Sequence, residues 1–229
     1  FFVLLAGLGF LVLPFIKREA AGLAKTTGVG FGLGFVACLG YGYLGVETVL
    51  IHELVLFVGH PVYAITVVVL TMLMASGLGS FYVQQLAPER LNKTLHMALG
   101  IIVVLGALQA WVIPGLLHAA FLGQPIALRL ALTALCLTPI GFVMGMPFPL
   151  SMRILRPSAS GMVPWAWALN GWMSVVASLG TVLVSRLYGY SQAFGVALVA
   201  YILATLLAHR ISAIGAISDA SSGDSEVAC

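Results

Sequence analysis

Few side chains in this sequence could carry chemistry, and most of them lie inside or beside apolar stretches. Glu47, His52, Glu53 and His60 follow one another along one such stretch, and Asn170 lies midway along another. An ionisable side chain near the centre of a membrane span costs about 2.5–3.5 kcal/mol on insertion scales, so its presence marks a candidate substrate or ion pathway. These five residues are therefore the candidate site residues of the chain.

The spacing of these residues argues against catalysis and against a metal site. At about 100° per helical residue, Glu53 points roughly 120° away from Glu47, so the two carboxylates do not form an acid–base pair on one face. His52 and His60 lack the i, i+4 spacing of a helical ligand pair. The three cysteines are too dispersed for a disulfide framework or a zinc site: Cys38, Cys136 and Cys229. We therefore expect no catalytic residues, no metal and no cofactor.

Three roles are open to Glu47. It is protonated and hydrogen-bonded inside a helix bundle, it pairs with a cation such as Arg129 or Arg186, or it lines a path for a cationic substrate. For Asn170 the first interpretation is packing, because an interhelical hydrogen bond in a membrane contributes about 0.6 kcal/mol on average.

The composition places these residues in a membrane protein. Of the 229 residues, 61% are apolar and 7% are charged, whereas a soluble domain has about a quarter of its residues charged. No cluster of Lys and Arg with interleaved aromatics is present, so nucleic acid is not an expected partner. Segments of about 20 apolar residues predict an all-α, polytopic transmembrane bundle of about seven spans. We expect them at residues 1–16, 30–50, 62–83, 95–113, 125–144, 163–183 and 193–208.

The distribution of basic residues predicts the orientation of the bundle. Eight of the ten Lys and Arg residues fall on one side of the predicted topology, which should be cytoplasmic. The C-terminus then lies inside the cell, and residues 211–229, rich in Ser, Ala and Gly, are expected to form a mobile cytoplasmic tail. The chain opens at Phe1 within an apolar run, so we expect a piece of a longer protein. The eight residues are Lys17, Arg18, Lys25, Arg90, Lys93, Arg153, Arg156 and Arg210.

Small residues at four-residue spacing predict where helices pack closely. Without a hydrophobic driving force in lipid, small side chains let helix backbones approach and gain dispersion contacts. The glycines expected at such contacts are Gly30, Gly34, Gly77, Gly79, Gly141 and Gly145.

Several stretches of the sequence resemble a known family. They are Val46–Ala64, Ala75–Ser80, Gly145–Leu150, Val163–Gly171 and Ser174–Val176. Together they resemble the membrane part of bacterial spermidine-synthase-like proteins, in which a transmembrane bundle is fused to an aminopropyltransferase-like domain. The resemblance spans about Gly40 to Ala208 and implies a location in the bacterial inner membrane. Within these stretches it draws attention to Glu47, His60, Pro147, Pro149 and Asn170.

The resemblance does not extend to the synthase domain. That domain has a Rossmann-like fold and depends on aspartates, whereas this chain has no Gly-rich strand-to-helix turn and no Asp before Asp219. The first functional hypothesis is therefore a non-catalytic membrane scaffold or accessory subunit, with the lipid bilayer and other membrane subunits or a cytosolic domain as partners. The second is a transporter or channel-like module for a cation or polyamine that uses Glu47. The third is the membrane part of a polyamine-synthase-like enzyme whose active site lies elsewhere.

Overall fold

The regular structure of the chain is helical. The computed structural model describes residues 29–121, 123–155 and 163–226, and the all-α fold predicted from the sequence is confirmed there. Six helical segments of this described part are long and apolar enough to cross a membrane. The predicted span at residues 1–16 lies outside the described residues. The helices are α3 (Val29–Val58), α4 (Pro61–Gln84), α5 (Leu91–Trp111), α6 (Ile113–Phe121), α7 (Ile126–Met144), α8 (Pro147–Leu155), α9 (Val163–Tyr188) and α10 (Tyr190–Glu226), with a short 3₁₀ turn, η1, at Pro88–Arg90.

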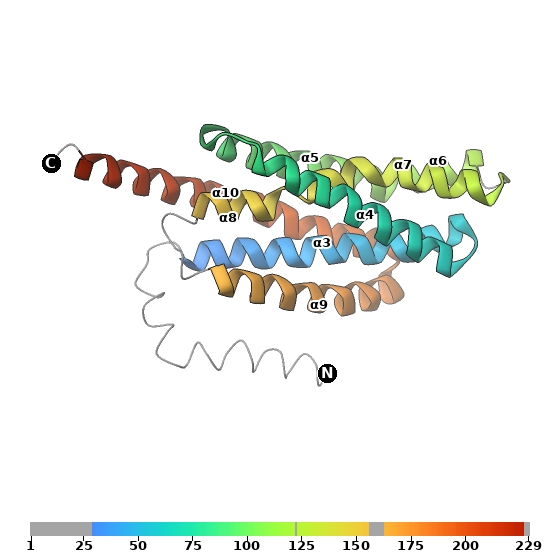
Figure 1. Cartoon of the computed structure of the whole chain (residues 1–229). Coiled ribbons are helices and arrows are strands. Elements are labelled where there is room, and N and C mark those ends of the chain that lie inside the picture. Colours follow the sequence, from blue (N-terminus) through green and yellow to red (C-terminus); the bar gives the residue numbers. More distant parts are fainter. Residues whose placement is uncertain (1–28, 122, 156–162, 227–229) are drawn as a thin grey trace.

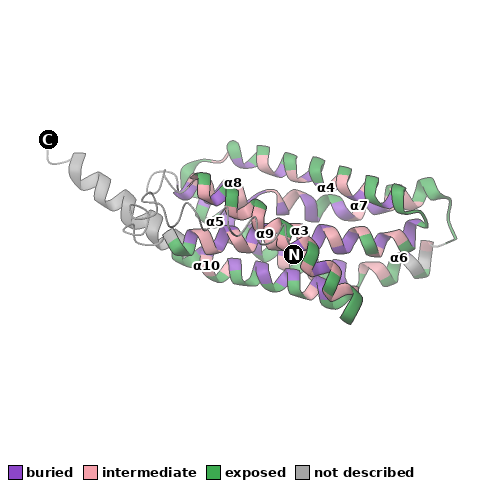
Figure 2. Ribbon diagram, turned by 90° about the horizontal axis from the view of Figure 1, so that it is seen from below, coloured by how far each residue is buried: buried purple, intermediate pink, exposed green. Residues whose placement is uncertain are grey.

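The long helices run side by side in an elongated bundle (Figure 1). Helix α3 packs mainly against α9 and α10, while α4 packs mainly against α7. Buried residues line the inner faces of the helices and exposed residues the outer faces (Figure 2). Many exposed residues are large and apolar, including Leu73, Leu135 and Leu183. A soluble protein rarely exposes a continuous surface of this kind, so these outer faces suit contact with lipid.

Two glycines make the short turns between consecutive helices. Gly59, at φ 84°, lies between α3 and α4, and Gly189, at φ 95°, lies between α9 and α10. Both backbones are in the left-handed region, which costs glycine nothing and other residues about 1–2 kcal/mol. Such short connections reverse the chain direction within one or two residues.

Prolines that follow two of the predicted spans begin new helices. Pro114 follows the predicted span 95–113 and is the second residue of α6. Pro147 follows the predicted span 125–144 and is the first residue of α8. A proline is tolerated in the first turn of a helix because its missing N–H would have no intrahelical partner there. The chain therefore continues as helix after α5 and after α7.

Glycines bring α4 and α7 to backbone contact. A Cβ atom on Gly79 would overlap the carbonyl oxygen of Phe142, and one on Gly145 would overlap the backbone of Ser76. Gly141 faces Ala75 and Met72 at the same crossing. Among the other glycines expected at helix contacts, Gly34 lies near Leu207, whereas Gly30 and Gly77 have open space beside them.

Two arginines bind the C-terminal carbonyls of helices at opposite ends of the bundle. Arg129 Nη1 donates to the Phe57 carbonyl at the end of α3, at a distance of 2.9 Å. Arg153 donates to the carbonyls of Val83 and Leu86 at the end of α4. The last carbonyls of a helix have no intrahelical donor and carry partial negative charge, which explains both contacts. Helix α10 continues to Glu226, through most of the segment predicted to be a mobile tail; its mobility stays a prediction.

We predict that Gly79→Ala destabilises the protein, whereas Gly100→Ala does not. The new methyl group at Gly79 must displace the Phe142 carbonyl, and overpacking of this kind costs typically about 1–3 kcal/mol. Gly100 lies on α5 with no atom near its missing Cβ, so alanine there gains about 1 kcal/mol of helix propensity. Thermal unfolding in a mild detergent measures both changes. Equal shifts in the two variants would show that the close contact of α4 with α7 is not required.

Candidate functional site

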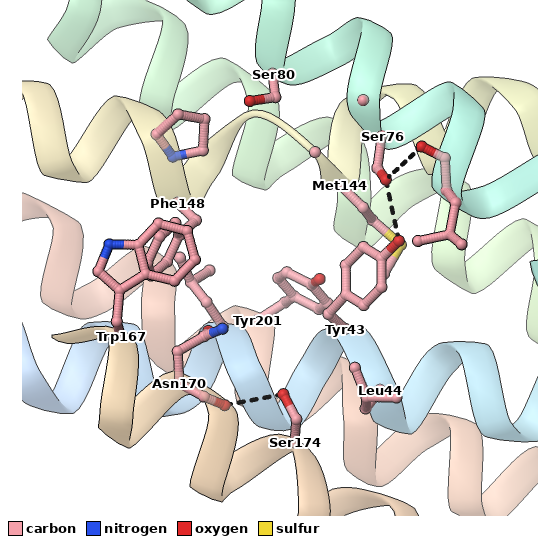
Figure 3. A pocket seen from close by; sticks show the side chains of 15 residues that line it. Tyr43, Leu44, Ser76, Ser80, Met144, Phe148, Trp167, Asn170, Ser174 and Tyr201 are labelled. Atoms are coloured by element: carbon pink, nitrogen blue, oxygen red, sulfur yellow. Dashed lines mark hydrogen bonds between the residues drawn. The ribbon is translucent and has the colours of Figure 1, made fainter.

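The bundle contains a cavity of about 560 Å³ between α3, α4, α9, α10 and the junction of α7 with α8. Its side chains supply hydroxyls, one amide and the indole of Trp167, and no charged side chain lines it. The side chains of Tyr43, Phe148, Trp167, Asn170 and Tyr201 surround a common space (Figure 3). The polar lining residues are Tyr43, Ser76, Ser80, Asn170, Ser174 and Tyr201.

One side of the cavity is closed by a hydrogen bond between α3 and α4. The Tyr43 hydroxyl donates to the Ser76 Oγ atom at 3.1 Å, and Ser76 in turn donates to the Leu73 carbonyl at 3.3 Å (Figure 3). The Tyr43 side chain is long enough to reach from α3 to α4, across a gap that two small side chains would leave open. The bond fixes the distance between the two helices at the level of the cavity.

The opposite side is built where α3 and α9 cross. A Cβ atom on Gly40 would overlap the Asn170 carbonyl oxygen, so the two backbones touch. The Ser174 Oγ atom lies 2.8 Å from the Asn170 carbonyl and 3.3 Å from the Gly40 carbonyl, and its proton is shared between them. The Asn170 side-chain amide makes no hydrogen bond to the described residues and faces the cavity. It therefore offers two donors and an acceptor to a bound molecule.

Aromatic rings form the wall nearest the start of α8. Phe148 and Trp167 meet edge to face, with ring centroids 4.7 Å apart and planes at 72°. This is a favourable geometry for an aromatic pair. The indole of Trp167 is 61% exposed, so this wall reaches the outside of the bundle.

A helix break lies beside the cavity. Helix α7 ends at Met144 and α8 begins at Pro147, and Met144, Gly145, Phe148 and Pro149 line the cavity. Backbone groups at the break are paired locally, since Gly145 N–H donates to Gly141 and Met146 N–H to Val143. Interrupted helices at membrane depth are a recurrent feature of transporter binding sites.

Glu47 is buried beside the cavity but does not line it. Its side chain is 7% exposed, and it lies one helical turn after Tyr43, close enough for electrostatic interaction. Within the described segments it forms no ion pair with Arg129 or Arg186; Arg129 is engaged at the end of α3 and Arg186 is exposed. Of the three roles considered for Glu47, pairing with these arginines therefore does not occur in this structure.

The remaining candidates lie toward the other end of α3 and do not gather with Asn170. Glu53 is half-buried, and the exposed His52 donates from Nδ1 to the Thr48 carbonyl at 2.7 Å. His60 is the N-cap residue directly before α4, and its ring centroid lies 5.0 Å from that of Tyr63. No group of three or more His, Cys, Asp or Glu residues is placed to hold a metal within the part of the chain that the structure describes.

Several cavity residues were missed by reasoning from the sequence. They are of types that are ordinary in apolar helices: Tyr43, Ser76, Trp167, Ser174 and Tyr201. One signal was available. Of the five stretches singled out in the sequence, four contribute to the cavity and Val46–Ala64 does not; the four are Ala75–Ser80, Gly145–Leu150, Val163–Gly171 and Ser174–Val176.

Comparisons of the chain with family models, with curated proteins and with solved structures find no match. The chain is a multi-pass helical protein with six candidate membrane spans in its described part. Its function must therefore be argued from the cavity and from the side chains that line it.

We predict that the hydrogen bond between Tyr43 and Ser76 stabilises the bundle. In a double-mutant cycle of Tyr43→Phe and Ser76→Ala, the coupling energy should be about 0.6 kcal/mol, the average for interhelical hydrogen bonds in membranes. As a control, Thr66→Val removes a hydroxyl that bonds only within α4, to the Val62 carbonyl, and should not couple to Tyr43→Phe. Unfolding midpoints measured in detergent give the coupling energies of both cycles. A coupling of zero in the first cycle would contradict the assignment.

Proposed function

We propose that this chain is a non-catalytic integral membrane module that holds a small ligand in its central cavity. We further propose that it is the membrane part of a larger spermidine-synthase-like assembly. The observation that carries the proposal is that three separate stretches of the sequence, Ala75–Ser80, Gly145–Leu150 and Val163–Gly171, converge on one cavity. They belong to the five stretches on which the resemblance rests; Ser174–Val176 also reaches the cavity through Ser174, whereas Val46–Ala64 does not line it.

The properties of the cavity support a binding role. Its volume of about 560 Å³ falls within the range of roughly 300–1,000 Å³ that is usual for small-molecule sites. Such sites are mostly apolar with a few well-placed polar groups, and this cavity combines aromatic and aliphatic walls with the groups of Asn170, Ser174 and Ser76.

The sequence supports an assembly in which the membrane bundle is non-catalytic and another domain carries out the chemistry. The bundle supplies no nucleophile beside a base and no aspartate before Asp219. In the proteins it resembles, the transferase chemistry belongs to the fused domain. Other subunits or a cytosolic domain would meet the bundle at the end where Arg90, Lys93 and Arg153 lie, which the charge distribution predicts to be cytoplasmic.

We predict that Ser174→Ala reduces the amount of small molecule that remains bound to the purified protein, whereas Ser178→Ala does not. Both serines lie on α9 and both donate to the carbonyl four residues earlier, but only Ser174 lines the cavity, where it also contacts the Gly40 carbonyl of α3 and its oxygen can accept a hydrogen bond from a ligand. Loss of one hydrogen bond to a ligand costs about 0.5–1.5 kcal/mol, or up to about tenfold in affinity. Native mass spectrometry measures the bound mass. Absence of any adduct on the wild type, or equal adducts on both variants, would refute the proposal.

A second candidate function is a pathway for a cation such as a polyamine. One observation favours it: Glu47 is buried in the apolar part of α3 and lies beside Tyr43, which lines the cavity. A buried carboxylate near a cavity is a typical counter-ion for a transported cation.

We predict for this second function that Glu47→Gln lowers uptake of labelled putrescine into proteoliposomes by about tenfold, the effect of roughly 1.4 kcal/mol. Glu89→Gln, which changes an exposed acid in η1, serves as the control and should leave uptake unchanged. If wild-type protein takes up no putrescine, or if Glu47→Gln transports it as well as the wild type does, the pathway role of Glu47 is wrong.

A further inference from the structure

We infer that the ligand of the cavity is a membrane-dissolved, single-chain amphiphile with an uncharged, hydrogen-bonding head group, and that it reaches the cavity sideways from the bilayer between α4 and α9. The inference rests on the proposed binding function and names its ligand class. It follows from where the mouth of the cavity lies, which groups line its interior, and how its apolar walls are arranged.

The mouth of the cavity faces lipid. Leu73 and Gly77 on α4 and Trp167 on α9 line the cavity and are also exposed on the outside of the bundle, with 59% of Leu73 and 61% of Trp167 accessible. Leu73 is twelve residues from Pro61 and eleven from Gln84, the two ends of α4. At 1.5 Å per residue it lies about 16–18 Å from each end, near the middle of a hydrocarbon core about 30 Å thick. Trp167 lies four residues from Val163, the start of α9, so the mouth extends from the middle of the bundle toward one end, and a molecule that enters beside Leu73 comes from the bilayer.

The interior selects an uncharged head group. Six lining residues offer hydroxyl or amide groups, and the lining contains neither an acid nor a base. A charged head group would be buried without a counter-ion, which is expensive at this depth. A hydroxyl or carbonyl group can instead pair with the free amide of Asn170 and with the hydroxyl of Ser80.

The walls of the cavity suit one apolar chain. Leu39, Leu44, Met144 and the rings of Phe148 and Trp167 provide a continuous apolar surface from the interior to the mouth. The lining is mostly apolar, so most of the ligand is hydrocarbon.

Gly77 provides a direct test of the route. It lies at the mouth, and a Cβ atom there would meet no other atom within 4 Å, so a larger side chain can be added without moving the backbone. Gly100, on α5, is also helical, exposed and free of neighbours at its missing Cβ, but it is not part of the cavity. Gly77→Leu and Gly100→Leu are therefore matched variants that differ in whether they obstruct the mouth.

The experiment uses the full chain in phosphatidylcholine liposomes with three photoreactive diazirine probes of equal chain length: a fatty alcohol, a fatty acid and an alkyl trimethylammonium. We expect the alcohol to label peptides of α4 and α9 around Leu73 and Trp167 most strongly. We expect Gly77→Leu to reduce this labelling by about tenfold, equivalent to roughly 1.4 kcal/mol, and Gly100→Leu to leave it unchanged.

Each other outcome overturns part of the inference. Equal labelling of Gly77→Leu and the wild type would show that the lateral mouth is not the route, and stronger labelling by either charged probe would show that the head group is not neutral. If no probe labels the cavity but the purified protein still carries an adduct that Ser174→Ala loses, the lipid inference fails while the proposed function stands. If neither labelling nor an adduct is found, both fail.

Discussion

The structure depends on close backbone contact within two pairs of helices. Gly79 and Gly145 let α4 and α7 touch, and Gly40 lets α3 touch α9 at Asn170. Between these two tightly packed pairs the helices are held apart by longer side chains, chiefly Tyr43, Phe148 and Tyr201, and the cavity occupies that space. In a membrane, where lipid is as apolar as leucine, such dispersion contacts are a principal source of packing energy. The cavity therefore lies between the two pairs of helices that glycines bring into contact, where no glycine lets the helices approach as closely.

A second constraint shapes the ends and the break of the helices. Backbone groups in a membrane need internal partners, because no water is available to pair with them. Arg129 and Arg153 supply donors to the last carbonyls of α3 and α4, and local hydrogen bonds pair the groups between α7 and α8. This explains why Arg129 and Arg153, two of the few basic residues of the chain, donate hydrogen bonds to backbone carbonyls of neighbouring helices. It also explains how the interruption beside the cavity is accommodated, because the N–H groups of Gly145 and Met146 both find local acceptors.

Much of the fold could be predicted from the sequence, and little of the site. Long apolar stretches identify the helices because each must cross the bilayer, and the predicted spans 95–113 and 125–144 end close to the observed ends of α5 and α7, at Trp111 and Met144. What the apolar stretches do not show is that the chain resumes as helix directly afterwards. Pro114 and Pro147 terminate one helix only by starting the next. For the site, the sequence directs attention to charged residues and so to Glu47, which is buried but does not line the cavity. Asn170 was the one candidate that lines it, while the hydroxyls of Tyr43 and Tyr201 have no sequence pattern that separates them from packing residues.

Tyr43 connects the two functional interpretations, since it lines the cavity, bonds to Ser76 and lies beside Glu47. In the position observed, its hydroxyl is committed to Ser76, and Glu47 has no place in the lining. A neutral ligand can bind to this arrangement as it stands, because every group it needs already faces the cavity. A cation finds no carboxylate in the lining to pair with, and dehydrating its charge is expensive at this depth. The arrangement of α3 and α4 therefore favours an uncharged ligand.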